Sequence, residues 1–154
     1  MAGVSEEELR TVRFEPEMIP VCARIYLDVY TNEPWNETVE SAEAVERFFR
    51  RHAAGGEFIG YALLSGGRPA GFAIGFAKPW IKGVEFYLDE LCLAREFQHR
   101  GFGSRFMAEI RADLKKRGLN GILLNTSRHC PSFRFYRKLG FEPLEELVVM
   151  GVEF

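Results

Sequence analysis

The chain has 154 residues, which is enough for a single domain over residues 1–154. Its apolar fraction of 47% supports a full hydrophobic core, and its net charge of −2 leaves no basic surface for nucleic acid. No stretch approaches the ~18 uninterrupted apolar residues of a membrane span. Residues 1–8 are acidic and lack the basic and apolar regions of a signal peptide. These features predict a cytoplasmic protein that binds neither nucleic acid nor membrane.

Hydrophobic periodicity and turn residues predict ten elements. In chain order they are a strand at 11–14, helices at 18–30 and 41–52, strands at 57–64, 69–80 and 84–93, a helix at 104–117, a strand at 121–126, a helix at 132–139 and a strand at 147–154. The continuous apolar run at 121–126 suits a buried central strand. The order β-α-α-β-β-β-α-β-α-β predicts an α/β fold with a mixed sheet and helices on both faces.

The three cysteines and three histidines are scattered. Cys22 and Cys92 lie in apolar stretches, which favours buried thiols, and Cys130 stands apart from them. The spacing of these residues matches no zinc motif, and an odd set of cysteines argues against a disulfide framework. We therefore expect no metal site.

The segment Gln98-His99-Arg100-Gly101-Phe102-Gly103 joins a predicted strand to a predicted helix. Its two glycines leave backbone N–H groups unshielded, and a helix N-terminus adds unpaired donors and partial positive charge. Together these groups predict a pyrophosphate site. A lone Gly-x-Gly is weak evidence, but here a second block, Phe135-Tyr136-Arg137-Lys138-Leu139-Gly140-Phe141, follows at a fitting distance.

This pair of blocks resembles the GNAT superfamily of acyl-CoA-dependent N-acyltransferases. The first matches that family's Gln/Arg-x-x-Gly-x-Gly/Ala loop, and the second its Phe-Tyr-x-Lys-x-Gly-Phe segment. The resemblance implies acetyl-CoA as co-substrate and a sheet whose two central parallel strands, here 84–93 and 121–126, splay apart to hold it. It also allows a homodimer, which no residue of this chain establishes.

The resemblance implies two catalytic residues. Tyr136 occupies the position of a tyrosine near the thioester sulfur, where a phenol can protonate the departing thiolate. Glu90 lies near an acidic position of the family and is the candidate base for the amine. Strand alternation would turn Asp89 to the opposite face from Glu90, whereas a bulge would reverse that, so Asp89 and Tyr87 stay as alternatives.

The remaining candidate cofactor contacts follow from the same resemblance. The backbone of Leu91, Cys92 and Leu93 would polarise the thioester carbonyl. The pyrophosphate would bind the N–H groups of His99, Arg100, Gly101, Phe102, Gly103 and Ser104, with side-chain donors from Gln98 and Arg100. Many members have an asparagine where this chain has His129. Asn125 could substitute for it, and His129 is otherwise an exposed loop histidine.

The acceptor side is expected in the loop that follows the first helix. Trp35 with Glu33 and Glu37 would suit a cationic amine through cation–π and ion-pair contacts, and Tyr30 is a further candidate contact. The Pro-Trp-Asn-Glu run more weakly resembles aminoglycoside N-acetyltransferase-like members. Asp89 and Trp80 are further candidate acceptor contacts. Alternatively, Trp35 has a structural role and packs the loop against the core.

Three functions remain open at this stage. The first is N-acetylation of a small primary amine by direct transfer in a ternary complex. The second is N-acetylation of a protein or peptide amine, which requires a more open groove. The third is a non-catalytic acyl-CoA-binding module, against which the presence of Tyr136 and Glu90 argues.

Overall fold

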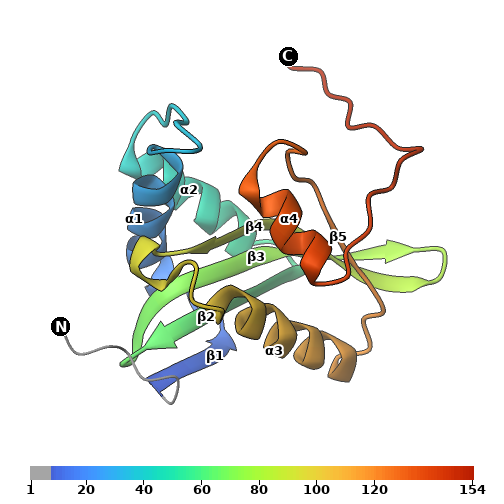
Figure 1. Ribbon diagram of the computed structural model, residues 1–154, viewed down its shortest axis with the longest axis horizontal. Coiled ribbons are helices and arrows are strands. Elements are labelled where there is room, and N and C mark those ends of the chain that lie inside the picture. The colour runs from blue at the N-terminus through green and yellow to red at the C-terminus, as the bar shows by residue number, and fades with distance from the viewer. Residues whose placement is uncertain (1–7) are drawn as a thin grey trace.

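The computed structural model describes residues 8–154. Within them the chain forms a five-stranded mixed sheet and four α-helices (Figure 1). In chain order the elements are β1 (Leu9–Arg13), α1 (Ile19–Tyr30), α2 (Ala42–Ala53), β2 (Phe58–Ser65), β3 (Arg68–Trp80), β4 (Gly83–Leu93), α3 (Phe102–Lys116), β5 (Ile122–Leu124) and α4 (Pro131–Lys138). The strands lie in sequence order, antiparallel from β1 to β4 and parallel between β4 and β5.

The helices cover both faces of the sheet, as the mixed-sheet prediction requires. On one face the apolar stripe of α1 packs with α2 against β3, around Cys22, Phe49 and Phe72. On the other face Phe106 and Ile110 of α3 pack against β2 and β4, and α4 lies beside them (Figure 1). Each layer therefore buries its own hydrophobic cluster against the shared sheet.

Local signals explain where helix α2 starts. The Ser41 side chain accepts a hydrogen bond from the Ala44 N–H at 3.1 Å, which caps the helix. Within the described residues no helix is both long enough and apolar enough to cross a bilayer.

The two parallel strands separate, as expected. The pairing of β4 with β5 ends at Leu88 and Leu124, although β4 continues to Leu93. Residues 90–93 of β4 therefore pair with β3 alone, and Asp89 pairs with neither neighbouring strand.

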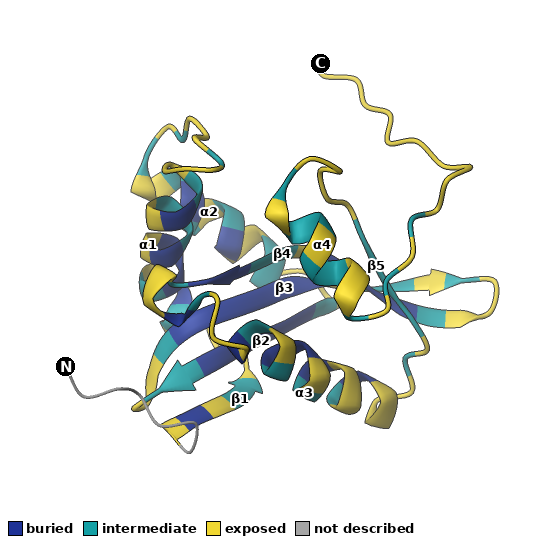
Figure 2. Cartoon of the chain, in the orientation of Figure 1, coloured by how far each residue is buried: buried dark blue, intermediate teal, exposed yellow. Residues whose placement is uncertain are grey.

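The expected strand at residues 147–154 is absent. That segment is extended but unpaired, and it runs away from the body of the molecule, exposed along its length (Figure 2). A strand needs the hydrogen bonds of a neighbour, and no other described strand lies beside this segment. Strand β5 is also shorter than the expected 121–126.

Candidate active site

A β-bulge in β4 sets the direction of its acidic side chains. Ile74 pairs with Glu90 and Gly75 pairs with Leu88, so Asp89 has no partner on β3. The two strands approach closely here, because a Cβ atom on Gly75 would overlap the carbonyl oxygen of Tyr87. The bulge adds one residue to β4 and interrupts its alternation.

Asp89 and Glu90 consequently face the same side of the sheet. The Asp89 carboxylate lies 2.6 Å from Nε2 of His52 on α2. The Glu90 carboxylate lies beside Tyr30 of α1 and also interacts with His52. Of the two arrangements left open by the sequence, the bulged strand is therefore the one present, and its extra residue returns the next side chain to the same face.

The surroundings of Glu90 make it a weak acid. Burial, joined by the negative charges of Asp89 and Glu37, raises its pKa from 4.5 to about 7, against the opposing effects of a Tyr30 hydrogen bond and of His52. The Tyr30 hydroxyl also reaches the Leu91 carbonyl, at 3.2 Å. Both protonation states of Glu90 are populated near neutral pH, which is the property of a group that accepts and releases protons.

Tyr136 reaches the same place from α4. Its ring packs against Phe135 and Phe141, with centroid separations of 5.2 and 5.3 Å. Burial raises its pKa, and the charges of Glu90 and Cys92 add to the shift, so the phenol stays protonated. Burial also raises the pKa of Cys92, which keeps that thiol neutral. The structure thus brings a potential base from β4 and a potential acid from α4 together.

The glycine loop has the backbone form that its sequence predicts. Gly101 is the N-cap of α3 with a φ of 81°, in the left-handed region that favours glycine, and it has no side chain to cap the helix. The first helical hydrogen bond runs from the Arg105 N–H to the Gly101 carbonyl, at 3.2 Å. The N–H groups ahead of Arg105 therefore begin the helix without intrahelical acceptors, an arrangement that fits a phosphate anion.

The side chains of the loop are turned towards the protein. Gln98 Nε2 donates to the Leu93 carbonyl at 2.8 Å, which ties the loop to the end of β4. The Arg100 guanidinium lies 4.7 Å from the Phe102 ring centroid and donates to the Glu96 carbonyl. Gln98 thus holds the loop in place, while Arg100 lies exposed on the surface of the loop.

The strand end of β5 faces Tyr87. Asn125 Nδ2 donates to the Tyr87 hydroxyl at 2.6 Å, and the Tyr87 ring stacks on Phe76. His129 lies in an exposed loop, where its backbone N–H donates to Ser127 Oγ at 3.3 Å.

An aromatic and acidic surface stands beside Glu90. Tyr30 packs against Tyr26 and Trp35, with centroid separations of 4.6 and 5.4 Å. The loop after α1 folds back, with the Glu37 N–H donating to the Tyr30 carbonyl at 2.7 Å. Burial first, and then the charges of Glu90, Glu37, Cys92 and Asp89, raise the pKa of Tyr26. Trp35 therefore packs against α1 through Tyr30 and also borders this surface.

The remaining predicted acceptor residues do not join this group. Glu33 is exposed in the loop. Trp80 is paired with Gly83 at the tip of the β3–β4 hairpin, and its Nε1 donates to Asn120 at 2.9 Å. Glu90 lies seven residues further along β4, roughly 20 Å away at the rise of a β-strand. Trp80 therefore does not reach the site.

Sequence reasoning missed Tyr26 and His52. The helical periodicity could have predicted Tyr26 as a site residue, since it lies four residues before Tyr30 on the same helical face. The approach of His52 to Asp89 depends on the bulge, for which no local sequence signal exists. Within residues 8–154, no group of three or more His, Cys, Asp or Glu side chains is arranged to hold a metal ion.

Three features are together expected of an acyltransferase. They are the separated parallel strands, the glycine loop at a helix N-terminus, and the proximity of Glu90 to Tyr136. The model of the acetyltransferase (GNAT) family matches residues 21–141. The chain therefore belongs to that family, whose members use acetyl-CoA. A search of curated protein sequences found no significant match.

Solved structures share the fold at low sequence identity. An aminoglycoside acetyltransferase from an uncultured soil metagenomic sample, in complex with sisomicin, has a TM-score of 0.70 at 14% identity over 97% of each chain. An aminoglycoside N-acetyltransferase in complex with CoA has a TM-score of 0.73 at 14% identity over 95% of each chain. A transcriptional regulator from Bacillus halodurans has a TM-score of 0.75 at 18% identity, over 94% of this chain and 99% of its own.

Proposed function

We propose that the protein transfers the acetyl group of acetyl-CoA directly to a primary amine of a small, cationic molecule while both substrates are bound. The observation that carries the proposal is the meeting of Glu90 and Tyr136 beside an acidic, aromatic surface at the point where β4 and β5 separate.

The residues around the glycine loop would hold acetyl-CoA. The N–H groups of residues 99–104 would bind its pyrophosphate, and Arg100 would supply positive charge at the loop. The backbone of residues 91–93, at the edge that β5 leaves, would face the thioester carbonyl, and Asn125 lies at the facing strand end. Acetyl-CoA supplies the activated acetyl group, and the chain supplies position and proton transfer.

Three proton transfers complete the chemistry. Glu90, when ionised, accepts a proton from the ammonium of the acceptor, and the free amine then forms the new C–N bond as the C–S bond breaks. Tyr136 donates its proton to the departing sulfur, and the second proton of the nitrogen, released as the amide forms, restores the phenol. A phenol held neutral by burial is suited to this donation, because a group that is already ionised has no proton to give.

The charge of the acceptor surface favours a cation. Glu37, Asp89 and Glu90 surround the aromatic rings of Tyr26 and Tyr30, so an ammonium would meet both carboxylates and π faces. Two of the structural neighbours are aminoglycoside acetyltransferases, which makes polycationic amino sugars the first compounds to test.

The direct test is a panel of amines incubated with acetyl-CoA while free thiol release is followed. Amino sugars, polyamines and simple diamines should support release, and peptides with a free N-terminus or lysine should support much less. Release with peptides alone would favour a protein acetyltransferase. Coenzyme A binding without release on any amine would favour a non-catalytic module.

Binding at the glycine loop has its own test, with a matched control. Gly101 and Gly118 both have a φ above 80° and open space where a side chain would begin. Alanine at either position should cost about 1–2 kcal/mol of stability, because left-handed backbone disfavours Cβ. Calorimetry should show weaker coenzyme A binding for Gly101→Ala and unchanged binding for Gly118→Ala. Equal affinity in the two variants would remove the loop from the binding site.

A further inference from the structure

Three apolar side chains in the middle of the sheet form a row that the helices leave uncovered. Phe76 of β3 pairs with Tyr87 of β4, and Tyr87 pairs in turn with Leu123 of β5, so the three lie side by side on one face. Within residues 8–154, none of the three belongs to either of the hydrophobic clusters that the helices form on the sheet. We call these three residues the apolar row.

The apolar row lies on the face of the sheet that carries Glu90. Both neighbours of Tyr87 on β4 are buried against α3 on the opposite face, so alternation turns Tyr87 towards the side of α1 and α2. On that side of β3, Phe72 is fully buried beneath the two helices, whereas Phe76 is 36% exposed. A contiguous apolar surface that remains open beside carboxylates indicates a binding surface.

Ring and hydrogen-bond contacts hold the apolar row in place. The Phe76 and Tyr87 rings stack with a centroid separation of 5.2 Å and an interplanar angle of 21°. Asn125 Nδ2 donates to the Tyr87 hydroxyl at 2.6 Å, and this bond links β4 to the residue that follows β5, just beyond the end of their pairing. A surface fixed in this way loses little freedom when a ligand binds to it.

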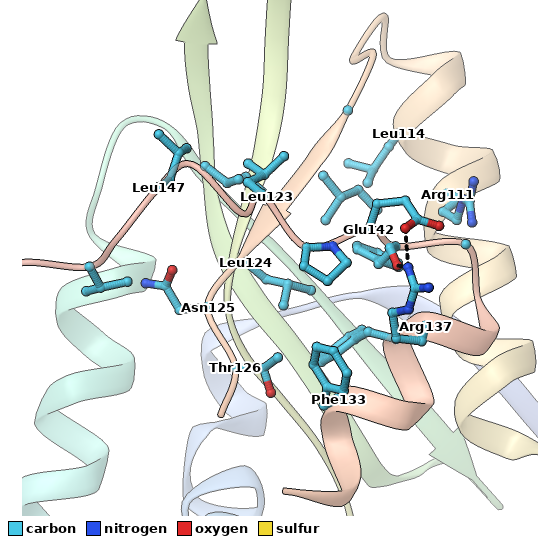
Figure 3. A pocket seen from close by; sticks show the side chains of 18 of the residues that line it. Arg111, Leu114, Leu123, Leu124, Asn125, Thr126, Phe133, Arg137, Glu142 and Leu147 are labelled. Atoms are coloured by element: carbon cyan, nitrogen blue, oxygen red, sulfur yellow. Dashed lines mark hydrogen bonds and ion pairs between the residues drawn. The ribbon is translucent and has the colours of Figure 1, made fainter. Parts of the chain in front are cut away.

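One end of the apolar row adjoins the cavity that contains the proposed acid. This cavity, of about 670 Å³, lies along β5 and between the facing sides of α3 and α4 (Figure 3). Its lining includes Tyr136, Asn125 and also Leu123 of the row itself. A molecule that covers the apolar row would therefore lie next to the place where we expect the acetyl group to be transferred.

The dimensions of the surface indicate the shape of its ligand. Asp89 follows Tyr87 by two residues on β4, roughly 7 Å at the rise of a strand, and the bulge brings its carboxylate and that of Glu90 to the face of the row. Across the strands the row spans two strand spacings, roughly 10 Å. A single alkyl chain would cover only part of this width, whereas a ring covers more of it and loses less conformational entropy on binding.

We propose that the apolar row binds the ring of the acceptor, so that Phe76 and Tyr87 are specificity-determining residues for a primary amine carried by a ring. The inference rests on the proposed function, because the ammonium of the acceptor lies at Asp89 and Glu90 while its ring covers the row. An open-chain amine makes the same ionic contact but covers less of the row, so it is the poorer substrate.

Two amines with the same charge and the same number of carbon atoms test this preference. Cyclohexylmethylamine carries a ring, and heptylamine is an open chain. In the thiol-release assay, the wild-type kcat/KM should be higher for the ring amine by about three- to tenfold, the range of one contact to an aromatic ring.

A substitution at Phe76 tests whether the apolar row is the cause. Phe76→Thr removes the ring and keeps a residue that favours strands, so it should abolish the preference by raising KM for the ring amine. Unchanged affinity for coenzyme A would show that the variant is folded. The control Ile81→Ala removes an exposed apolar side chain at the tip of the β3–β4 hairpin and should keep the wild-type preference.

Saturation-transfer NMR with coenzyme A bound provides a readout that needs no turnover. The ring protons of cyclohexylmethylamine should receive saturation from the wild type and lose it in Phe76→Thr. If both amines are acetylated with equal kcat/KM, the assignment of the row is overturned and the proposed function stands. If no amine releases thiol, the proposed function fails instead; saturation that depends on Phe76 would then retain the row as a ring-binding surface, and its absence would overturn the row as well.

Discussion

Strand β4 has strand partners on both sides at residues 86–88, whereas residues 90–93 pair with β3 alone and Asp89 has no strand partner. In the first part Phe86 and Leu88 are buried, and the neighbouring Glu85 forms an ion pair with Lys78 at 3.1 Å. In the second part the bulge turns Asp89 and Glu90 to one face, where the other charges acting on Glu90 are Glu37 and His52. The part paired on both sides serves the core, and the part that β5 leaves keeps the carboxylate and backbone groups to which we assign the proposed substrates.

The largest effect should come from Gly75, which lies opposite the bulge. Gly75→Ala would drive its Cβ into the Tyr87 carbonyl, so β3 and β4 must separate. We expect a loss of about 3 kcal/mol in the free energy of unfolding, at the upper range for overpacking, and a loss of turnover because Glu90 moves. Urea unfolding and amine-dependent thiol release measure the two effects.

A matched alanine substitution serves as its control. Gly56→Ala meets no atom within 4 Å and should stay within about 0.5 kcal/mol of the wild type. A fully active, fully stable Gly75→Ala protein would show that the close approach at the bulge has no role in placing Glu90.

Tyr136→Phe should reduce turnover with little effect on folding. The ring still packs between Phe135 and Phe141, but the proton donor is lost. General acid catalysis contributes about 10²–10⁴-fold, so kcat should fall at least tenfold while coenzyme A affinity is kept. Tyr61→Phe, which removes a hydroxyl bonded to Asp113 away from the site, should lower stability and leave kcat unchanged. Wild-type kcat in Tyr136→Phe would exclude this residue as the acid.

Glu90→Gln should remove the acidic limb of the pH–rate profile. The wild-type rate should rise as pH increases through about 7, where the Glu90 carboxyl ionises and becomes a base. The glutamine variant should be slow, with no such rise. A limb that persists in this variant would assign the titration to another group.

Although Glu90→Gln should lower the rate, it should raise the free energy of unfolding at high pH. The folded-state pKa of Glu90 is raised, so its favourable contribution is complete below pH 4.5 and is lost as pH rises through 7. Glu90→Gln should therefore be more stable than the wild type at pH 8, by on the order of 1–3 kcal/mol, with the difference shrinking toward pH 4.5. Urea unfolding at both pH values measures it.

Asp89→Asn should give the smallest of these effects, a shift in the acidic limb of the pH–rate profile. This shift distinguishes the bulged end of β4 from its other end. After burial, the Asp89 charge is the next largest cause of the raised Glu90 pKa, so its removal should move the acidic limb to lower pH. Glu85→Gln, at the paired end of the strand, should leave the limb in place. A shift with Glu85→Gln and none with Asp89→Asn would contradict the assigned faces of the strand.

Local sequence patterns predicted the sheet, the helices and the glycine loop, because periodicity and turn residues act over a few positions. They left open whether Asp89 and Glu90 share a face, since the bulge that decides it lies opposite Gly75 on another strand. They predicted a strand at 147–154 from its composition, but a strand also needs a partner that composition does not reveal. Trp80 was misplaced because its distance from Glu90 depends on hairpin geometry.

The bulge also affects how this chain is compared with its relatives. A bulge is one added residue, so a relative with a regular strand has one position fewer between the equivalents of Leu88 and Glu90. An ungapped alignment would then match Glu90 to a residue on the opposite face. At 14–18% identity, acidic residues are better matched by the direction of their side chains than by their order in the sequence.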